Sequence, residues 1–222
     1  MRKDRIAIAI DGPAASGKSS TAKAIAKELG FLHVDSGSLY RAATAARMRS
    51  LAKDRRWTEA TVLDAARHVS LRPAETGFAA LIGGQDADDE IRSPEVTQNV
   101  SQVAKMPALR EWVNSQVRQV AREHDVVVDG RDIGTVVFPD AALKIFLVAE
   151  PGQRARRRLL ERLGREPSEN EVAEETGRIV NRDEMDADQS VMAPGAVVID
   201  TTHLTQADQV SRIVEMVRAL RR

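Results

Sequence analysis

The strongest constraint on this chain is the stretch RIAIAIDGPAASGKSS at residues 5–20, where an apolar run leads into a glycine-bounded loop. Gly12, Gly17, Lys18 and Ser19 fill the phosphate-loop pattern G-x-x-x-x-G-K-[ST]. The glycines let the backbone curl around a phosphate chain, and the following helix adds the positive end of its dipole. Lys18 can reach the outer phosphates and the Ser19 hydroxyl can bind Mg²⁺. The pattern therefore predicts a nucleotide phosphate site between a strand and a helix.

Composition restricts the class of protein. A length of 222 residues suits one α/β domain with an insert or a small satellite. The 33 basic and 33 acidic residues cancel, which gives no general case for binding nucleic acid or a membrane. The absence of cysteine excludes disulfides, thiol catalysis and cysteine-ligated metals. The first apolar run is short and leads straight into the loop, so we expect a core strand, no signal peptide and a cytoplasmic location.

Strand-like and helix-like segments alternate along the chain. Apolar, largely β-branched runs typical of buried parallel strands occupy residues 5–10, 31–34, 126–130, 143–148 and 197–200. Helical patterns lie between them, with recognisable ends such as Gly30 and the capping box from Ser168 to Glu171. The alternation predicts an α/β fold in three layers, with a five-stranded parallel sheet between helices. Residues 69–92 differ, since VSLRP, FAALI and a turn at 86–90 indicate a small β insert.

Three of the predicted strands end in polar residues that a core does not need. The first runs into the phosphate loop, the second into DSGSLYR from Asp35, and the third into DGRD from Asp129. Any one of these polar residues, taken alone, could be a loop residue that faces water. Parallel strands share one carboxyl edge, however, where arginines can grip phosphate and carboxylates or serines can bind ring edges or ribose hydroxyls. Together they predict a crevice that holds a second phosphate-bearing ligand.

Two features leave alternatives open. Residues 154–166, RARRRLLERLGRE, fit a solvated helix face, because Arg154, Arg158, Arg162 and Arg165 follow a surface spacing. They also fit a lid whose arginines stabilise a transferred phosphoryl group and whose closure excludes water, and we favour the lid. Asp129 could act on Mg²⁺ through one of its ligands, or could only cap its strand. We expect surface or core positions for the histidines, His33, His68, His124 and His203.

Taken in order, these segments resemble bacterial cytidylate kinases, in the nucleoside monophosphate (NMP) kinase group of P-loop kinases. The matching segments are IDGPAASGKSS, DSGSLYR, residues 90–110, VVDGRDIGTVVFPDA at 127–141, and KIFL at 144–147. The resemblance covers essentially the whole chain, and the block at 127–141 is its most specific part. It implies phosphorylation of CMP or dCMP by ATP with Mg²⁺, by direct in-line transfer.

The resemblance also implies roles for individual residues. Those implied to bind ATP are Gly12, Pro13, Ala14, Ala15, Ser16, Gly17, Lys18, Ser19 and Ser20, with Ser19 as the Mg²⁺ ligand. Those implied to bind the acceptor nucleotide are Asp35, Ser36, Arg41, Ser101, Arg110, Arg131, Asp132, Arg182 and Asp186. Those implied to act in phosphoryl transfer are Lys18, Arg131, Arg157 and Arg158, the last two within the lid.

Within the acceptor site the implied work is divided by chemistry. Arginines at positions 41 and 131 would hold the acceptor phosphate, and Ser36 would hold the ribose. The residues that would read the cytosine edge are Ser101, Arg110 and Asp132. Arg182 and Asp186, in RDEMD, would reach the sugar and the phosphates.

The regions expected from this resemblance form one P-loop kinase chain, residues 1–222. The core covers about residues 1–35, 105–152 and 190–222. An NMP-binding region at about 36–104 contains the β insert, and the lid covers about 153–188. The expected partners are small nucleotides, ATP with CMP or dCMP, without nucleic acid or membrane, and the expected state is a monomer.

One position departs from the family pattern R-D-x-x-D-x-x-R, because Gln189 stands where the last arginine is expected. A neutral amide removes one cation from the acceptor-phosphate clamp, which could cost ~1.5–3 kcal/mol, or about one to two decades of rate or affinity. Arg178 could substitute for the missing charge. Otherwise the enzyme could be slower or prefer another acceptor.

Two other functions compete with cytidylate phosphorylation. A kinase of the same fold could use UMP or a small alcohol, for which Asp35 or Asp132 could serve as the base. A non-catalytic regulator could have kept the loop only to bind a nucleotide. We favour the cytidylate kinase because the whole crevice is present in the sequence.

Overall fold

The computed structural model describes residues 5–50 and 56–220, and its centre is a parallel sheet. The five predicted strands are present as β1 (Ala7–Asp11), β2 (Leu32–Asp35), β6 (Val126–Gly130), β7 (Leu143–Val148) and β8 (Val197–Asp200). They pair in the order β2-β6-β1-β7-β8, each pair parallel. The structure confirms the predicted three-layer α/β fold. The first two strands are shifted by one or two residues, because ladder hydrogen bonds set strand ends more strictly than apolar runs do.

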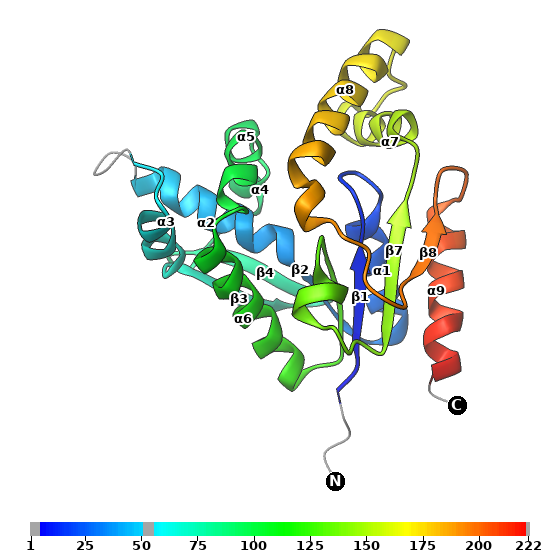
Figure 1. The fold of residues 1–222 in the computed structure, drawn as a ribbon, viewed down its shortest axis with the longest axis horizontal. Coiled ribbons are helices and arrows are strands. Elements are labelled where there is room, and N and C mark those ends of the chain that lie inside the picture. Colours follow the sequence, from blue (N-terminus) through cyan, green and yellow to red (C-terminus); the bar gives the residue numbers. More distant parts are fainter. Residues whose placement is uncertain (1–4, 51–55, 221–222) are drawn as a thin grey trace.

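Helices cover both faces of this sheet (Figure 1). One face carries α1 (Lys18–Leu29) and α9 (Gln206–Leu220). The other carries α2 (Ser36–Ser50), α3 (Glu59–Ala66), α5 (Pro94–Val103) and α6 (Pro107–Glu123). Successive side chains of a strand point to opposite faces, so Ile8 and Ile10 of β1 join the first core and Ala9 joins the second. Burying each isoleucine contributes roughly 1.5–3 kcal/mol.

The β insert is present as β3 (Val69–Ala74), β4 (Gly77–Ile82) and β5 (Gln85–Asp86), all paired antiparallel. It is not separate from the main sheet, because β4 pairs parallel with β2 at His33 and Gly77. The turn expected at 86–90 is wrong in part, since α4 (Asp88–Ile91) forms there. Its acidic residues lie at the positive end of the helix dipole, and the buried side chain of Ile91 fixes it to the core.

Most predicted helix ends have the expected chemistry, whereas two short helices besides α4 were not predicted. Ser168 accepts from the Glu171 N–H while Glu171 accepts from the Ser168 N–H, as expected for a capping box. These two are a π-helical turn, η1 (Ile133–Val137), and a 3₁₀ turn, η2 (Ala187–Gln189). The carboxylate of Asp11 accepts from the N–H groups at the start of η1, at 2.8 and 2.7 Å. No local pattern encodes a contact between residues so far apart in sequence.

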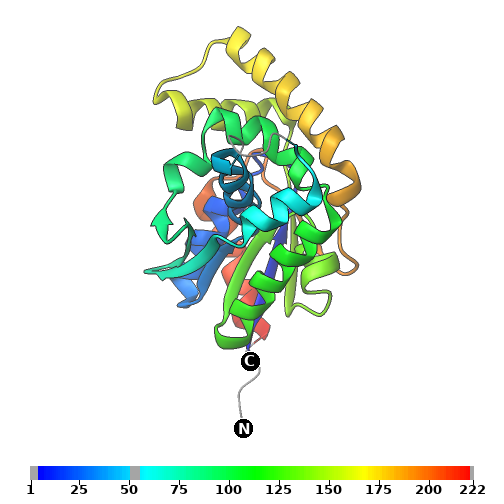
Figure 2. The same cartoon turned by 90° about the vertical axis from the view of Figure 1, so that its left-hand side faces the viewer.

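The lid segment folds as two packed helices, α7 (Pro151–Leu163) and α8 (Glu169–Asp186). This pair extends from the side of the sheet where the phosphate loop lies (Figures 1 and 2). It has a small apolar core of its own, formed by Ala155, Leu159, Val172 and Ile179. The division into core, NMP-binding region and lid stays a prediction, and its residues 1–4, 51–55 and 221–222 lie outside those described. Among the described helices, none is both long and apolar enough to span a membrane.

The junction between the β insert and the sheet depends on Gly77. A Cβ at Gly77 would lie 2.5 Å from the carbonyl oxygen of His33, so no side chain fits between β4 and β2. We expect Gly77→Ala to lower the free energy of unfolding by roughly 1–3 kcal/mol, the cost of overpacking. Gly152→Ala is the control, because a Cβ there meets nothing within 4 Å and alanine favours a helix by up to about 1 kcal/mol. Denaturant unfolding of both variants tests this, and equal stability would contradict it.

Candidate active site

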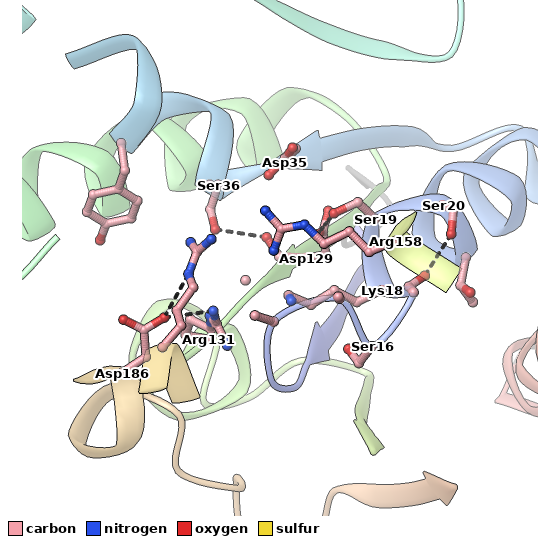
Figure 3. Close-up of a pocket in the computed structure, with 18 of the residues that line it drawn as sticks. Ser16, Lys18, Ser19, Ser20, Asp35, Ser36, Asp129, Arg131, Arg158 and Asp186 are labelled. Atoms are coloured by element: carbon pink, nitrogen blue, oxygen red, sulfur yellow. Dashed lines mark hydrogen bonds and ion pairs between the residues drawn. The ribbon is translucent and has the colours of Figure 1, made fainter. Parts of the chain in front are cut away.

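A cavity of about 520 Å³ lies at the carboxyl ends of β1, β2 and β6 (Figure 3). Three peptide segments that follow these strands line it, together with residues of α5, α6, α7 and α8. The sites predicted for the donor and for the acceptor are therefore two parts of one cavity. Parallel strands bring their carboxyl ends to the same edge, which is why segments more than a hundred residues apart meet here.

Most of the predicted site residues line this cavity. They are Ala14, Ala15, Ser16, Gly17, Lys18, Ser19, Ser20, Asp35, Ser36, Arg41, Ser101, Arg110, Arg131, Asp132, Arg157, Arg158, Arg182 and Asp186. Two predicted residues do not line it. Gly12 lies against β7, where a Cβ would be 2.3 Å from the carbonyl oxygen of Leu147, and the Pro13 carbonyl accepts from Lys18 Nζ at 2.9 Å. Gly12 and Pro13 therefore shape the phosphate loop without facing the cavity.

The phosphate loop ends in a helix start that is adapted to anions. Gly17, with φ +85°, is the N-cap of α1, and Ala15 also has a positive φ of 57°. The ammonium group of Lys18 folds back over the loop. Burial, and next the charge of Arg131, lower the pKa of Lys18 to about 8. A bound phosphate would favour the charged lysine, because an opposite charge offsets the desolvation of both groups.

Ser19 contacts a buried carboxylate, and this bears on the two interpretations of Asp129. Ser19 Oγ donates to Asp129 Oδ2 at 2.5 Å, and Asp129 Oδ1 lies 2.7 Å from His33 Nε2. The side chain of Asp129 is thus directed at the predicted Mg²⁺ ligand, as the first interpretation requires. Hydroxyl and carboxylate oxygens are the donors that Mg²⁺ prefers, so the residues present fit this ion.

His33 lies neither on the surface nor in an apolar core, and that part of the expectation for the histidines is wrong. Its ring contacts Asp129 because β2 and β6 are neighbours in the sheet. Burial alone would lower the pKa of His33, but the hydrogen bond to Asp129 and the charges of Asp129 and Asp35 raise it above its ordinary value. Burial, and next the charge of Asp129, also raise the pKa of Asp35.

The arginines on the acceptor side are held by aspartates and main-chain oxygens. Arg131 pairs with Asp186 at 2.7 Å and donates to the Gly12 carbonyl at 3.2 Å. Arg110 pairs with Asp132, and its Nη1 donates to Gln189 Oε1 at 2.9 Å. Side-chain exposures of 18% and 20% for the two arginines show that both ion pairs are largely withdrawn from water. The cations are therefore pre-placed before any phosphate binds.

Two lid arginines are held by protein groups, and the role of Arg157 over ATP stays a prediction. Arg154 is not on a solvated face, because it is 4% exposed and donates to the Ala14 carbonyl at 2.8 Å. Asp183 pairs with Arg154 and also accepts from the Ala14 N–H, so α7, α8 and the phosphate loop meet at one point. Arg157 lines the cavity but donates to the main-chain oxygens of Thr201 and Thr202. Its contacts anchor it to the segment after β8.

The cavity also contains residues that the sequence did not single out for binding. Tyr40 is 9% exposed, its hydroxyl has no hydrogen-bond partner among the described residues, and Arg110 lies 6.0 Å above its ring. Burial raises the pKa of this tyrosine to about 12. Gly130 lets the chain pass Ser36, since a Cβ would lie 2.5 Å from Ser36 Oγ. Tyr40 lies in the DSGSLYR motif and Gly130 in the DGRD motif. Only their packing in the structure distinguishes them from the other residues of these motifs.

Comparisons with known proteins identify the family. A family model described as "Cytidylate kinase" matches residues 8–219. Three relatives carry the name cytidylate kinase. The relative from Geobacillus kaustophilus (strain HTA426) is 45% identical, and the match covers 97% of each chain. The relative from Geobacillus sp. (strain WCH70) is 42% identical, also with 97% of each chain covered. The relative from Caldanaerobacter subterraneus subsp. tengcongensis is 41% identical, with 96% of this chain and 95% of the relative covered. The chain belongs to the cytidylate kinase family.

Among solved structures, shikimate kinase from Bacteroides thetaiotaomicron is similar to this chain with a TM-score of 0.49. The two are 16% identical, and the match covers 96% of this chain and 98% of the other. A likeness at this level carries no functional information.

Gln189 is the residue at which this member of the family departs from the expected arginine. It lines the cavity and accepts a hydrogen bond from Arg110, so the amide is built into the site. The expectation that Arg178 could replace the missing charge is wrong. Arg178 does not line the cavity, is 66% exposed and pairs with Glu174 and Glu175. Gln189 therefore orients the guanidinium of Arg110 and adds no positive charge to the site.

The buried carboxyl of Asp11 makes the stability of the site depend on pH. Burial raises its pKa from 3.8 to about 6, although N–H groups of Gly134 and Ile133 oppose the shift. The native chain thus binds this proton more tightly than the unfolded chain does. We expect the unfolding free energy of the wild type, relative to Asp11→Asn, to fall by about 2–3 kcal/mol between pH 4 and pH 7. Denaturant unfolding at several pH values measures this, and a difference that does not change with pH would contradict it.

Proposed function

We propose that this chain transfers the γ-phosphoryl group of ATP directly to the phosphate of CMP or dCMP. The observation that carries this proposal is a single cavity in which the phosphate loop faces the cations of the DGRD segment. Membership of the cytidylate kinase family supports the choice of acceptor. The relatives of this chain carry the name cytidylate kinase, and no feature of this chain favours another acceptor.

The reaction needs no covalent intermediate and no strong base, because the acceptor phosphate is already a nucleophile. Lys18 would draw the β- and γ-phosphates into the loop, and Arg131 would lie between donor and acceptor. Arg131 now pairs with Asp186, so phosphate oxygens would compete with that carboxylate for its N–H groups. Catalysis would then consist of positioning and of neutralising the charge on the moving group.

Mg²⁺ is part of this proposal. The Ser19 hydroxyl would bind the ion and Asp129 would orient that hydroxyl, since the two are already hydrogen-bonded. The ion would neutralise phosphate charge while the loop N–H groups hold the oxygens. His33, on the far side of Asp129, would hold the carboxylate in place.

The acceptor side of the cavity is suited to a nucleotide. Arg41 donates to Thr97 and to the Ile91 carbonyl, and it lines the cavity together with Asp35 and Ser36, where it would bind the acceptor phosphate or ribose. Asp132, held by Arg110, and Ser101 would read the cytosine edge. For an alcohol acceptor a free base would be needed, yet Asp132 is paired with Arg110 and Asp35 accepts two hydrogen bonds from Ser38. The monomeric state and the cytoplasmic location stay predictions.

A panel of acceptors tests the proposal. With ATP and Mg²⁺, we expect rapid ADP release with CMP and dCMP and at least about tenfold lower kcat/KM with UMP, because the cytosine amine would meet Asp132. Arg131→Ala should lose several decades of kcat with CMP while staying folded, although the loss of the ion pair with the buried Asp186 should lower its unfolding temperature. Arg67→Ala, on the exposed end of α3, is the matched control and should be unaffected. Near-normal CDP production by Arg131→Ala would contradict the assignment.

Adjacent serines allow a sharp test of the Mg²⁺ site. Ser19→Ala removes the proposed ligand and the partner of Asp129, whereas Ser20 Oγ only donates to the Gly17 carbonyl on the exposed side. We expect Ser19→Ala to need at least about tenfold more Mg²⁺ for half-maximal activity, since a charge-assisted contact is worth roughly 1.5–3 kcal/mol. Ser20→Ala should keep the wild-type Mg²⁺ dependence. Equal dependence in both variants would exclude Ser19 as the ligand.

A further inference from the structure

The lid contains a buried carboxylate that no step of the proposed reaction uses. Glu175, on the inner face of α8, is 2% exposed. Three arginines surround it, namely Arg158 and Arg162 from α7 and Arg178 from its own helix. A buried acid needs cationic partners, but one would be enough for a neutral pair. The number of arginines therefore calls for a further explanation.

The three cations divide between the two oxygens of the carboxylate. Arg158 approaches Oε1 through its Nε atom, at 3.3 Å. Arg178 and Arg162 approach Oε2 through Nη1, at 3.3 and 3.7 Å. Arg158 is the only member of the cluster that lines the cavity among the residues described, and Figure 3 shows its side chain pointing inward.

The use of Nε leaves the two terminal nitrogens of Arg158 available. The closest contact of Arg158 with Glu175 is made by Nε, and neither Nη atom has a hydrogen bond with the described residues. A guanidinium held at its Nε side by an ion pair keeps its direction, while the Nη pair can still donate to two phosphate oxygens. The contact with Glu175 therefore orients Arg158 without occupying the groups that would bind phosphate.

The two arginines that do not line the cavity, Arg162 and Arg178, change the net charge of this cluster. Alone, Glu175 and Arg158 would form a neutral pair with little attraction for a polyphosphate. Arg162 and Arg178 are 52% and 66% exposed, yet both reach the buried Oε2. They offset the charge of the carboxylate, and the positive charge of Arg158 stays available to the cavity.

We propose that Glu175 is a positioning residue that directs Arg158 at the terminal phosphates of ATP, with Arg162 and Arg178 as its charge compensators. This inference rests on the proposed function, because it assigns Arg158 to the donor nucleotide. The donor is chosen over the acceptor because α7 adjoins the phosphate loop, where Arg154 contacts Ala14.

The orienting role is tested with two substitutions of Glu175. Glu175→Leu removes the carboxylate beside Nε, and we expect ATP with Mg²⁺ to bind about tenfold more weakly in calorimetric titrations without CMP. Glu175→Gln keeps an amide oxygen, and its ATP affinity should stay within about threefold of wild type. Arg156→Gln, on the same helix but paired with the exposed Glu166 and Glu169, is the control. Equal ATP affinity in the Leu and Gln variants overturns the proposal.

The charge role is tested on exposed residues, which decides the matter even if Glu175→Leu fails to fold. In Arg162→Gln/Arg178→Gln, the carboxylate should neutralise Arg158 and weaken ATP binding about five- to tenfold. Adding Glu175→Gln should restore most of that loss, which a purely structural role would not do. A triple variant that binds ATP no better than the double variant overturns the proposal.

Turnover separates this inference from the proposed function. If ATP binding changes as expected but wild type transfers nothing to CMP, the proposed function is wrong and the role of Glu175 stands. If KM for CMP changes while ATP affinity does not, Arg158 serves the acceptor and the inference is wrong.

Discussion

The parallel pairing of β1 with β6 determines where the charged groups of the site lie. Its register places Ile10 beside Asp129 and Asp11 beside Gly130, so the phosphate loop and the DGRD segment leave the sheet side by side. Ser19, which follows the loop, can then reach Asp129, and Arg131 can reach the Gly12 carbonyl. A shift of one residue in this register would reverse the faces of β6 and separate these contacts. The apolar core on both faces of the sheet therefore fixes the geometry of the chemistry.

That geometry concentrates positive charge in one cavity, and the chain balances it with buried aspartates. Arg131 with Asp186, and Arg110 with Asp132, keep the cations solvated by protein groups in the absence of phosphate. Such pairs add little to stability, because desolvation offsets their attraction. Their effect is to hold the guanidinium groups in place, so that phosphate oxygens can exchange with carboxylates without a large reorganisation.

The sequence predicted what is encoded locally or at strand ends, and it missed what depends on packing between distant segments. The glycine loop, the capping box at Ser168 and the β-branched strands have short-range causes, and these predictions were confirmed. The contact of His33 with Asp129 and the two bonds from η1 to Asp11 depend on sheet order and on a close approach at Gly134. No spacing rule reveals them, because each joins elements about a hundred residues apart.

The lid shows how a pattern with two interpretations becomes specific in three dimensions. Arginine-rich α7 lies beside acid-rich α8, and the ion pair of Arg156 with Glu169 is exposed and worth about 0–1 kcal/mol. The solvated face that the arginine spacing suggested is only partly present, because Arg158 and Arg162 pair with the buried Glu175. The buried end differs, because Arg154 and Asp183 fix the loop at Ala14. A movement of α7 and α8 relative to the sheet must therefore also move the phosphate loop. The lid is in this way coupled to the donor site.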